Sequence, residues 1–275
     1  MGRLRSHRCV RDERNRIDSS RIKKKRKWTI LYASGMIIPG RARCNCILVK
    51  YIHNAKTGKF NRKQYNMKSQ KIHEIVIATT NQGKTVEIEH VLSPAGIIVR
   101  SLDEFAPLPE ARETGATFAQ NARQKAQYYS RLLNTCVLAD DSGLQVNALD
   151  GAPGIYSARF AGVEGSDRDR ANNTKLLGLL SGISPEKRIA QFCCSLCLCN
   201  PAEILIEVQA FWPGLITDQP RGNNGFGYDP VFLLPNQNKT VAELSKEEKI
   251  KISHRGQALQ KLLEKLTYLP FGLKL

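Results

Sequence analysis

The stretch Val137-Leu138-Ala139-Asp140-Asp141-Ser142-Gly143-Leu144 is typical of an α/β enzyme, because an apolar run ends in two adjacent carboxylates, a hydroxyl and a glycine. Paired acids at the end of a buried strand are where such enzymes commonly place a metal ion and the base that works beside it. The alternative is a plain strand, turn and strand, since Asp, Ser and Gly all favour turns. A turn rich in glycine and proline, at residues 150–154, should then bring the chain back over this edge.

Outward from this stretch, the chain from residue 67 onward alternates between short β-rich runs and longer helical patterns. Strands are expected at residues 75–78, 97–99, 137–140, 144–148, 189–199, 204–211 and 231–234, and helices at 85–92, 117–133, 168–180 and 254–266. Thr117-Phe118-Ala119-Gln120 and Ser245-Lys246-Glu247-Glu248 predict capping boxes at helix starts. The pattern predicts one α/β domain with a mixed, twisted sheet flanked by helices, and it contains no apolar run of transmembrane length.

The positive charge is concentrated in the first quarter of the chain. Residues 1–66 hold 19 of the 42 lysines and arginines but 3 of the 25 acidic residues, so that they carry a net charge of +16 and residues 67–275 carry +1. The overall charge of +17 therefore does not indicate that the following domain binds nucleic acid.

Residues 1–66 are expected to be a basic extension without a fold, or a segment upstream of a true start at Met67. Their Arg-rich, acid-poor composition also fits an organelle transit peptide, or a tail that binds nucleic acid or a membrane surface. The apolar run at residues 28–39 is too short to be a transmembrane helix. It follows a positive region, as in a signal peptide. The functional domain is therefore predicted to be residues 67–275.

Four of the eight cysteines, Cys193, Cys194, Cys197 and Cys199, lie within seven residues. This crowding suggests a zinc site, but the surrounding run is strand-like, and alternate residues of a strand point to opposite faces. Without Gly, Pro or Asn between them to form a turn, four such sulfurs cannot surround one ion. We expect them to be buried, small apolar side chains, and reduced thiols favour an intracellular compartment.

The segment Ala78-Thr79-Thr80-Asn81-Gln82-Gly83-Lys84-Thr85 follows the first strand and opens the first helix. It differs from the Walker phosphate loop because Ala78 stands where that loop needs its first glycine. Even so, free backbone N–H groups, hydroxyls and a lysine at a strand-to-helix turn suit a triphosphate. The alternative is an ordinary junction between a strand and a helix.

Three further segments carry side chains suited to the same chemistry. Glu113 precedes a capped helix with Asn121 and Lys125 on one face, which suits a metal and phosphates, although a solvated helix face has the same pattern. The glycine-rich loop at residues 222–230 contains two aromatic rings, and a ring on an open loop suits stacking on a base. Ser253-His254-Arg255-Gly256 adds two groups that can carry positive charge.

Together these motifs resemble the inosine/xanthosine triphosphate pyrophosphatases, and they occur in that family's order from about residue 72 to 266. The matching blocks are Asn81-x-Gly83-Lys84, Glu113-Thr114-Gly115-x-Thr117-Phe118-x-x-Asn121-Ala122-x-x-Lys125-Ala126, Ala139-Asp140-Asp141-Ser142-Gly143-Leu144, Gly151-Ala152-Pro153-Gly154-Ile155-Tyr156-Ser157-Ala158-Arg159, Gly225-Phe226-Gly227-Tyr228-Asp229-Pro230 and Ser253-His254-Arg255-Gly256-Gln257-Ala258. Residues 1–66 match nothing in the family, so the resemblance implies nothing about them.

The resemblance implies hydrolysis of ITP, dITP and XTP to the monophosphate and pyrophosphate with Mg²⁺, which keeps deaminated purines out of DNA and RNA. It implies that Asp141 is the general base, and that the metal ligands come from Glu113, Asp141 and Asp140. The residues it implies in substrate binding are Thr79, Thr80, Asn81, Gln82, Gly83, Lys84, Asn121, Lys125, Ser142, Phe226, Gly227, Tyr228, Asp229, Lys249, His254 and Arg255. In this scheme lysines hold the triphosphate, Phe226 stacks on the purine, and His254 and Arg255 read its 6-oxo group.

Three positions depart from the family's pattern. Thr80 stands where many relatives have a small residue, Gln191 replaces an expected basic residue, and Ala210 replaces an expected glycine. None takes part in the implied chemistry, but Thr80 could alter the shape of the phosphate loop.

Two other functions compete with this one. A nucleic-acid-binding or ribosome-associated protein would use the basic extension, so that deleting residues 1–66 would remove its affinity, whereas an enzyme would stay active. A septum-inhibition (Maf-like) pyrophosphatase would act on modified pyrimidine nucleotides, but the Phe226 loop and residues 253–256 disfavour it. We expect a cytoplasmic homodimer that acts on a small nucleotide, with no membrane partner and with nucleic acid bound, if at all, through the extension.

Overall fold

The computed structural model describes residues 48–53, 60–65 and 72–269, and the chain divides into two units, Met1–Lys68 and Ser69–Leu275. In the first unit, β1 (Leu48–His53) pairs with β2 (Phe60–Tyr65) as an antiparallel hairpin. The sequence analysis predicted no strands in residues 1–66; the rest of that segment, and the proposed start at Met67, lie outside the described residues. No helix in the described ranges is long and apolar enough to cross a membrane.

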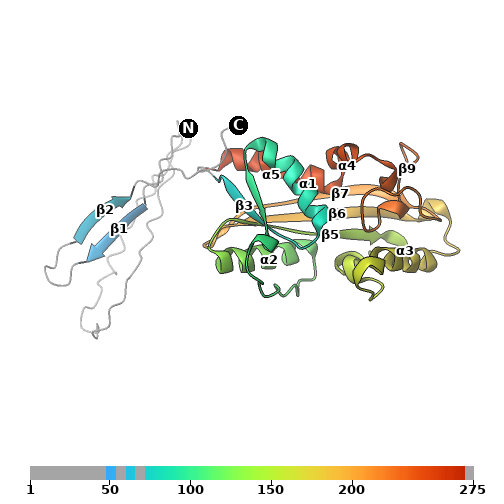
Figure 1. The fold of residues 1–275 in the computed structure, drawn as a ribbon, viewed down its shortest axis with the longest axis horizontal. Helices are drawn as coiled ribbons and strands as arrows, with labels where there is room; N and C mark the ends of the chain where they lie inside the picture. The colour runs from blue at the N-terminus through green and yellow to red at the C-terminus, as the bar shows by residue number, and fades with distance from the viewer. Residues whose placement is uncertain (1–47, 54–59, 66–71, 270–275) are drawn as a thin grey trace, which may run out of the picture. The chain divides into compact units, whose positions relative to one another are not determined.

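The second unit is built on a seven-stranded mixed sheet with the strand order β4-β3-β5-β6-β7-β8-β9 (Figure 1). The strands are β3 (Glu74–Ala78), β4 (Ile98–Ser101), β5 (Val137–Val146), β6 (Ile189–Cys199), β7 (Ile204–Ile216), β8 (Phe232–Leu234) and β9 (Lys239–Thr240). β3 pairs in parallel with β4 and β5, and all other neighbours are antiparallel. The mixed sheet predicted from the sequence is confirmed.

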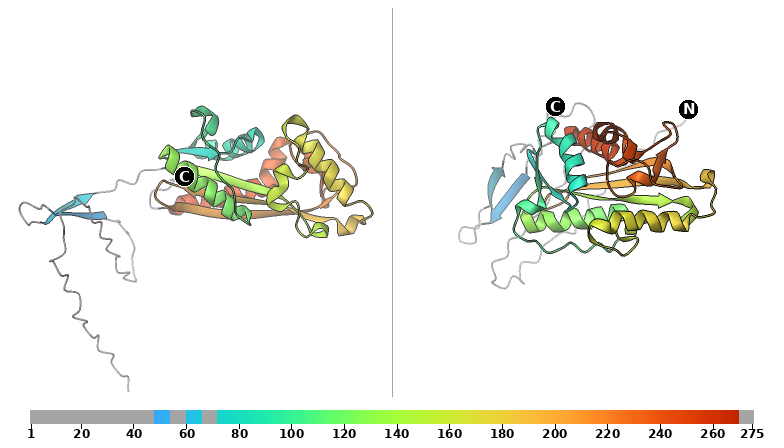
Figure 2. Two further views of the ribbon diagram at one scale, coloured as in Figure 1. Left: turned by 90° about the horizontal axis from the view of Figure 1, so that it is seen from below. Right: turned by 45° about the vertical axis from the view of Figure 1, so that its right-hand side comes forward.

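Helices cover both faces of this sheet, as two views show (Figures 1 and 2). The helices α1 (Gln82–Leu92), α4 (Lys246–Ile252) and α5 (His254–Tyr268) lie on one face, and α2 (Phe118–Leu133) and α3 (Arg168–Leu179) lie on the other. α5 buries Leu259, Leu262 and Leu266 at helical spacing against the sheet. Ala122, Ala126 and Tyr129 of α2 form the core on the opposite face, and Leu133, one turn further along the helix, is half-buried.

One strand prediction is wrong in a way that matters for the site. Residues 137–148 were expected to form two strands with a turn between them, but β5 runs unbroken from Val137 to Val146 because β6 pairs with it along its whole length. Gly143 is not a turn residue: a Cβ there would stand 2.3 Å from Ser157 Oγ. Ser157 belongs to the returning segment Gly154–Arg159, and its Oγ accepts a hydrogen bond from Leu144 N at 2.9 Å. The glycine therefore allows two segments to approach closely.

Of the two predicted capping boxes, one is complete and the other is formed only in part. At α4 the Ser245–Glu248 capping box is formed in both directions. At α2, Thr117 Oγ1 accepts from Gln120 N at 3.2 Å, but Gln120 Oε1 accepts from Ala116 N rather than from Thr117 N. The side chain of Gln120 thus reaches one residue further back than the sequence predicted.

The four clustered cysteines are all buried in β6. Cys194 packs under α1 and α5, whereas Cys197 and Cys199 pack under α2, with their sulfurs 3.6 Å apart. This division follows from the alternation of side chains along a strand, and the predicted burial is confirmed.

Candidate active site

The two acids of β5 point to opposite faces of the sheet. Because side chains alternate along a strand, Asp140 shares the face of Leu138, which packs under α1 and α5, and Asp141 shares the face of Ala139, which packs under α2. Both acids are buried. The neighbouring carboxylates that the sequence presents as a pair therefore lie in two different environments.

Asp140 binds two cations from separate helices. Its Oδ1 lies 2.7 Å from Lys84 Nζ of α1, and its Oδ2 lies 2.7 Å from Arg255 Nε of α5. Ser142 Oγ also donates to Asp140 Oδ1 at 2.8 Å, and Arg255 Nη2 donates to Ser142 Oγ. Burial alone would raise the pKa of Asp140, but the charges of Arg255 and Lys84 outweigh it and hold that pKa well below its usual value. Asp140 is therefore ionised, with both oxygens occupied.

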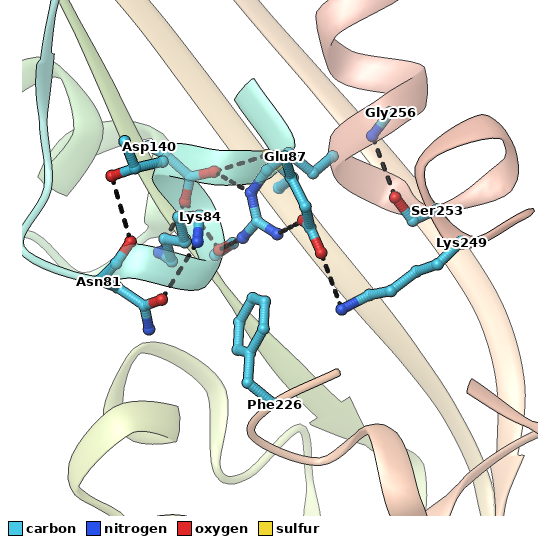
Figure 3. Close-up of polar contacts among 12 residues, drawn as sticks. Asn81, Lys84, Glu87, Asp140, Phe226, Lys249, Ser253 and Gly256 are labelled. Atoms are coloured by element: carbon cyan, nitrogen blue, oxygen red, sulfur yellow. Dashed lines mark hydrogen bonds and ion pairs between the residues drawn. The ribbon is translucent and has the colours of Figure 1, made fainter. Parts of the chain in front are cut away.

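The ion pairs continue from Arg255 through Glu87 to Lys249 (Figure 3). Lys249 Nζ lies 2.8 Å from Glu87 Oε1 and 2.6 Å from Asp229 Oδ2, and Glu87 also contacts Arg255 Nη1. We call the six linked residues the buried ion network: Lys84, Asp140, Arg255, Glu87, Lys249 and Asp229. Its three cations balance its three anions, which allows so many charges to be buried together.

Glu87 is the member of this network that the sequence analysis missed. It lies three residues after Lys84 and hence on the same side of α1. Its spacing from a predicted phosphate-binding lysine is the one trace of it in the sequence, and that spacing is equally typical of a solvated helix face.

Asp141 lies under α2, where fewer polar groups contact its carboxylate than contact that of Asp140 in the described structure. Lys125 Nζ of α2 lies 2.7 Å from Glu113 Oε1 and 3.3 Å from the backbone oxygen of Asp140. Within the described residues, the buried Oδ2 of Asp141 has no hydrogen-bond partner. Burial raises the pKa of Asp141 to about 6, against the opposing charges of Lys84 and Lys125. Such a carboxylate is mostly ionised at pH 7 and is suited to accept a proton.

Residues 78–85, the predicted phosphate loop, form the turn from β3 into α1. Asn81 Oδ1 caps the helix by accepting from Lys84 N at 3.1 Å, and Asn81 N donates to Thr79 Oγ1 at 3.1 Å. The side chains of Thr80 and Gln82 are exposed, and Gln82 bonds to a carboxylate outside the loop. These bonds hold a helix N-terminus in place, and such a terminus attracts phosphate.

The Phe226 ring lies against the same helix start. A Cβ on Gly83 would stand 2.6 Å from Phe226 Cδ1, so that only glycine permits this approach. Lys249 Nζ lies 4.2 Å from the centre of the ring and Arg255 Cζ lies 5.8 Å from it, both within the range of cation–π attraction. The ring therefore adjoins both the phosphate loop and the buried ion network (Figure 3).

His254 opens α5 inside an aromatic cluster. Its ring stacks on Phe192 at 4.7 Å between centroids and lies 6.2 Å from the Trp212 ring. Burial, reinforced by the charge of Arg255, holds the pKa of His254 well below its usual value, so the ring is neutral. Its Nδ1 is buried and has no hydrogen-bond partner in the described part of the chain.

The structure thus gathers the predicted residues into two adjoining groups. The first surrounds the buried ion network and contains Thr79, Asn81, Gly83, Lys84, Asp140, Ser142, Phe226, Asp229, Lys249, His254 and Arg255. The second lies under α2 and contains Glu113, Asn121, Lys125 and Asp141. The exposed side chains of Thr80 and Gln82 join neither group, and Gly227 and Tyr228 contact α3 and its neighbouring segment.

The carboxylates under α2 fit a magnesium ion. Among the described residues, no cluster of three or more His, Cys, Asp or Glu side chains could hold a metal. Mg²⁺ needs only one or two protein carboxylates when water and substrate phosphates complete its coordination. Within the described ranges Asp141 has a carboxylate oxygen without a partner, and Glu113 contacts the same Lys125 that borders it. Asp140 fits less well, because both of its oxygens bind cations.

Comparison with known proteins places these features in one family. Residues 75–265 match the model of the Ham1 family. The dITP/XTP pyrophosphatase of Exiguobacterium sp. (strain AT1b) is 51% identical over 189 residues, which cover 69% of this chain and 94% of that protein. The dITP/XTP pyrophosphatase of Bacillus licheniformis is 50% identical over 69% of this chain and 95% of its own length.

Solved structures agree with the sequence matches. A HAM1 protein from Coxiella burnetii superposes with a TM-score of 0.64 at 40% identity, covering 70% of this chain and 98% of that one. The Ham1 protein of Staphylococcus aureus gives a TM-score of 0.60 at 43% identity, covering 69% and 95%. The matched part is the second unit, in which both groups of site residues lie.

Proposed function

The chain belongs to the Ham1 family, and on that basis we propose that it hydrolyses deaminated purine nucleoside triphosphates (dITP, ITP and XTP) to the nucleoside monophosphate and pyrophosphate. Such an activity removes these nucleotides before they enter DNA or RNA. The names of the relatives, dITP/XTP pyrophosphatases, support the substrate class. A homodimeric state and a cytoplasmic location remain predictions from the family resemblance.

One observation carries the chemical part of the proposal: Asp141 is buried, has a pKa of about 6 and keeps one carboxylate oxygen without a partner among the described residues. A general base needs a free oxygen and a pKa near the working pH. In the proposed reaction, Asp141 takes a proton from water as the water oxygen bonds to the α-phosphorus. The bond from that phosphorus to the α–β bridging oxygen breaks, and pyrophosphate leaves.

Glu113 and Asp141 are the residues we propose to hold Mg²⁺. When bound, the ion would neutralise phosphate charge at the reacting centre. Asp140 is better suited to a different task, because it holds Lys84 beside the phosphate loop.

The triphosphate carries about four negative charges, so that protein cations must compensate them before water can approach. Lys84 and Lys125 flank β5 from its two faces, and the N-terminus of α1 adds oriented backbone N–H groups. Thr79 and Asn81 shape this terminus.

The base is proposed to stack on Phe226, whose ring lies next to the phosphate loop. His254, with a neutral ring and an unpartnered Nδ1 in the described structure, is suited to a polar edge of the purine. Arg255 is fully buried and bound to Asp140, Glu87 and Ser142, so that its guanidinium lies in a fixed place beside the ring. Gly227, Tyr228 and Asp229 continue the loop that would shape the pocket.

The direct test is product release by the full chain with Mg²⁺, comparing dITP, ITP and XTP with ATP and GTP. Released pyrophosphate is measured as orthophosphate with and without added inorganic pyrophosphatase. We expect orthophosphate only when that enzyme is present, a strong preference for the deaminated bases, and no turnover in EDTA. Orthophosphate without the coupling enzyme would contradict cleavage at the α-phosphorus, and equal rates on all five nucleotides would contradict the substrate class.

Replacing Phe226 by leucine should raise KM for ITP and XTP by about 5-fold to 100-fold, because an aromatic stack on a base contributes about 1–3 kcal/mol. kcat should change little, since the contacts of the ring in the described structure are with Gly83, Lys249 and Arg255 and not with Asp141 or Glu113. Steady-state kinetics on both substrates measures the effect, and Phe226→Tyr is the matched control because it keeps the aromatic face. Equal KM values for Phe226→Leu and wild type would rule out the stacking role.

A further inference from the structure

The loop that carries Phe226 is bound by α3 at the next residue. Gly227 N donates to Asp169 Oδ2 at 2.7 Å, and Gly227 O accepts from Asn173 Nδ2 at 2.9 Å. Asp169 and Asn173 lie four residues apart in α3 and therefore on one side of it. Both backbone polar groups of the residue after Phe226 are thus held by a single helix.

This loop has a backbone that needs external support. Gly225 and Gly227 both have positive φ, 78° and 64°, a region that glycine enters freely. Glycines on either side of Phe226 leave its position poorly determined by local sterics alone. Inside the loop, Phe226 N donates to Asp229 Oδ2 at 2.8 Å. The ends of the loop are held elsewhere, by Asn224 on the backbone oxygens of Ala242 and Leu244 and by Lys249 on Asp229, whereas the two bonds from α3 hold the residue next to Phe226.

The Asn173 side chain is oriented by Gly227. It is buried, and its Oδ1 has no hydrogen-bond partner within the described residues. Turning the amide over would place that oxygen against Gly227 O and lose the only hydrogen bond that its side chain makes in the described structure. The observed orientation leaves Oδ1 without a partner in the described structure, which costs free energy, but it keeps the bond to Gly227 O. That bond therefore determines how the amide is oriented.

The following residue is supported from the same side. Tyr228 Oη donates to Ser157 O at 2.9 Å, and Asn172 Nδ2 of α3 donates to the same oxygen at 3.2 Å. Tyr228 is buried in the core that also contains Leu176 and Leu180. α3 therefore holds Gly227 directly and supports Tyr228 through Ser157, whose backbone oxygen Asn172 also binds.

We propose that Asp169 and Asn173 are positioning residues that set where the Phe226 ring meets the purine, an inference that rests on the proposed function. They act on the base and not on the reacting phosphorus, because Asp141 and Glu113 lie under α2 and, in the described structure, share no hydrogen bond with α3. Their loss should raise KM for nucleotides and leave kcat nearly unchanged.

The test compares Asn173→Asp, Asp169→Leu and Asp169→Asn with wild type in the full chain. Asn173→Asp keeps the size of the side chain but sets a carboxylate against Gly227 O, and Asp169→Leu removes the acceptor for Gly227 N. Each should raise KM for ITP and XTP about twofold to tenfold, the effect of one hydrogen bond. Asp169→Asn keeps an acceptor oxygen and should stay near wild type. Thr174→Ala, an exposed neighbour in α3, is the control for the helix itself.

Inorganic tripolyphosphate, which has no base, separates positioning from general damage. Its inhibition constant should change far less than KM in all variants, because it has no base to stack on the Phe226 ring. An inhibition constant that rises in parallel with KM would overturn the inference, as would an unchanged KM in Asn173→Asp. If Asn173→Asp fails to fold, the KM values of Asp169→Leu and Asp169→Asn are compared instead, and equal values would overturn the inference. A wild-type chain that hydrolyses neither ITP nor XTP would instead contradict the proposed function.

Discussion

Replacing Asp141 by asparagine is expected to lower kcat by about 10²-fold to 10⁴-fold, the usual contribution of a general base. The amide has the same size, so the geometry around Lys125 and Glu113 should persist while the proton acceptor is lost. Pyrophosphate release from ITP and XTP with Mg²⁺ measures the loss. Asp218→Asn, at an exposed position, is the control. Activity within tenfold of wild type would assign the base to another residue.

The same substitution should stabilise the protein in the absence of metal. Burial raises the pKa of Asp141 from 3.8 to about 6, so that between pH 4 and 6 the folded chain binds more protons than the unfolded chain. The contribution of Asp141 to the free energy of unfolding therefore falls as the pH rises through this window, and it costs about 1–3 kcal/mol at pH 7. Asparagine cannot ionise and avoids that cost.

Urea unfolding in EDTA, followed from pH 4 to pH 8, tests this prediction. The stability of Asp141→Asn relative to wild type should increase with pH and level off above about pH 7. A variant that is less stable than wild type at pH 8 would show that the Asp141 carboxylate is compensated by its neighbours. Loss of activity together with a gain in stability would distinguish a functional carboxylate from a structural one.

Asp140→Asn should have the opposite effect and lower the free energy of unfolding at pH 7 by about 3–5 kcal/mol, because it leaves buried cations without a counter-charge. Arg255 and Lys84 both lose an ion pair of 2.7 Å. Since folding lowers the pKa of Asp140, its contribution is fully present above its unfolded pKa and is lost as the pH falls through its folded pKa. The difference between variant and wild type should thus be largest near neutral pH and shrink in strong acid.

Two further variants test whether the loss of stability comes from buried charges left without a counter-charge. Glu207→Gln breaks an ion pair with Arg123 that is nearly as short, 2.8 Å, but lies at the surface, and should cost at most about 1 kcal/mol. Adding Lys84→Met to Asp140→Asn removes one uncompensated cation and should recover part of the lost stability. Equal costs for Asp140→Asn and Glu207→Gln would contradict the importance of charge balance in the buried ion network.

The sequence predicted most of the fold because its strands and helices carry clear hydrophobic periodicity. It failed at residues 137–148, where Ser142 and Gly143 have the composition of a turn. What makes this stretch continuous is its pairing with β6 and the close approach of Ser157 to Gly143, and neither contact leaves a local signal. Had β5 been predicted as one strand, alternation alone would have placed Asp140 and Asp141 on opposite faces.

Among the site residues, too, some can be recognised from the sequence and others cannot. Asp141, Glu113, Lys84 and Phe226 stand in motifs whose residue types suggest their chemistry. Glu87, Asp169 and Asn173 do not, because a polar residue on a helix is usually solvated. Their partners come from distant segments: Lys249 and Arg255 for Glu87, and Gly227 for the two residues of α3. Such contacts become visible only once the tertiary structure brings the segments together.

Asp140 and Asp141 lie on opposite faces of β5, and this placement determines which mutations of the strand can be tolerated. Side-chain substitutions alter one environment at a time, since the sheet separates Asp140 from Asp141. The loss or gain of one codon before Asp140 exchanges the two environments, because a shift of one position turns every later side chain of the strand to the other face. Asp141 would then lie on the face of Arg255 and Asp140 on the face of α2, and one of the two positions, 140 or 141, would lack a carboxylate. Length changes in this strand should therefore be far less tolerated than any single replacement within it.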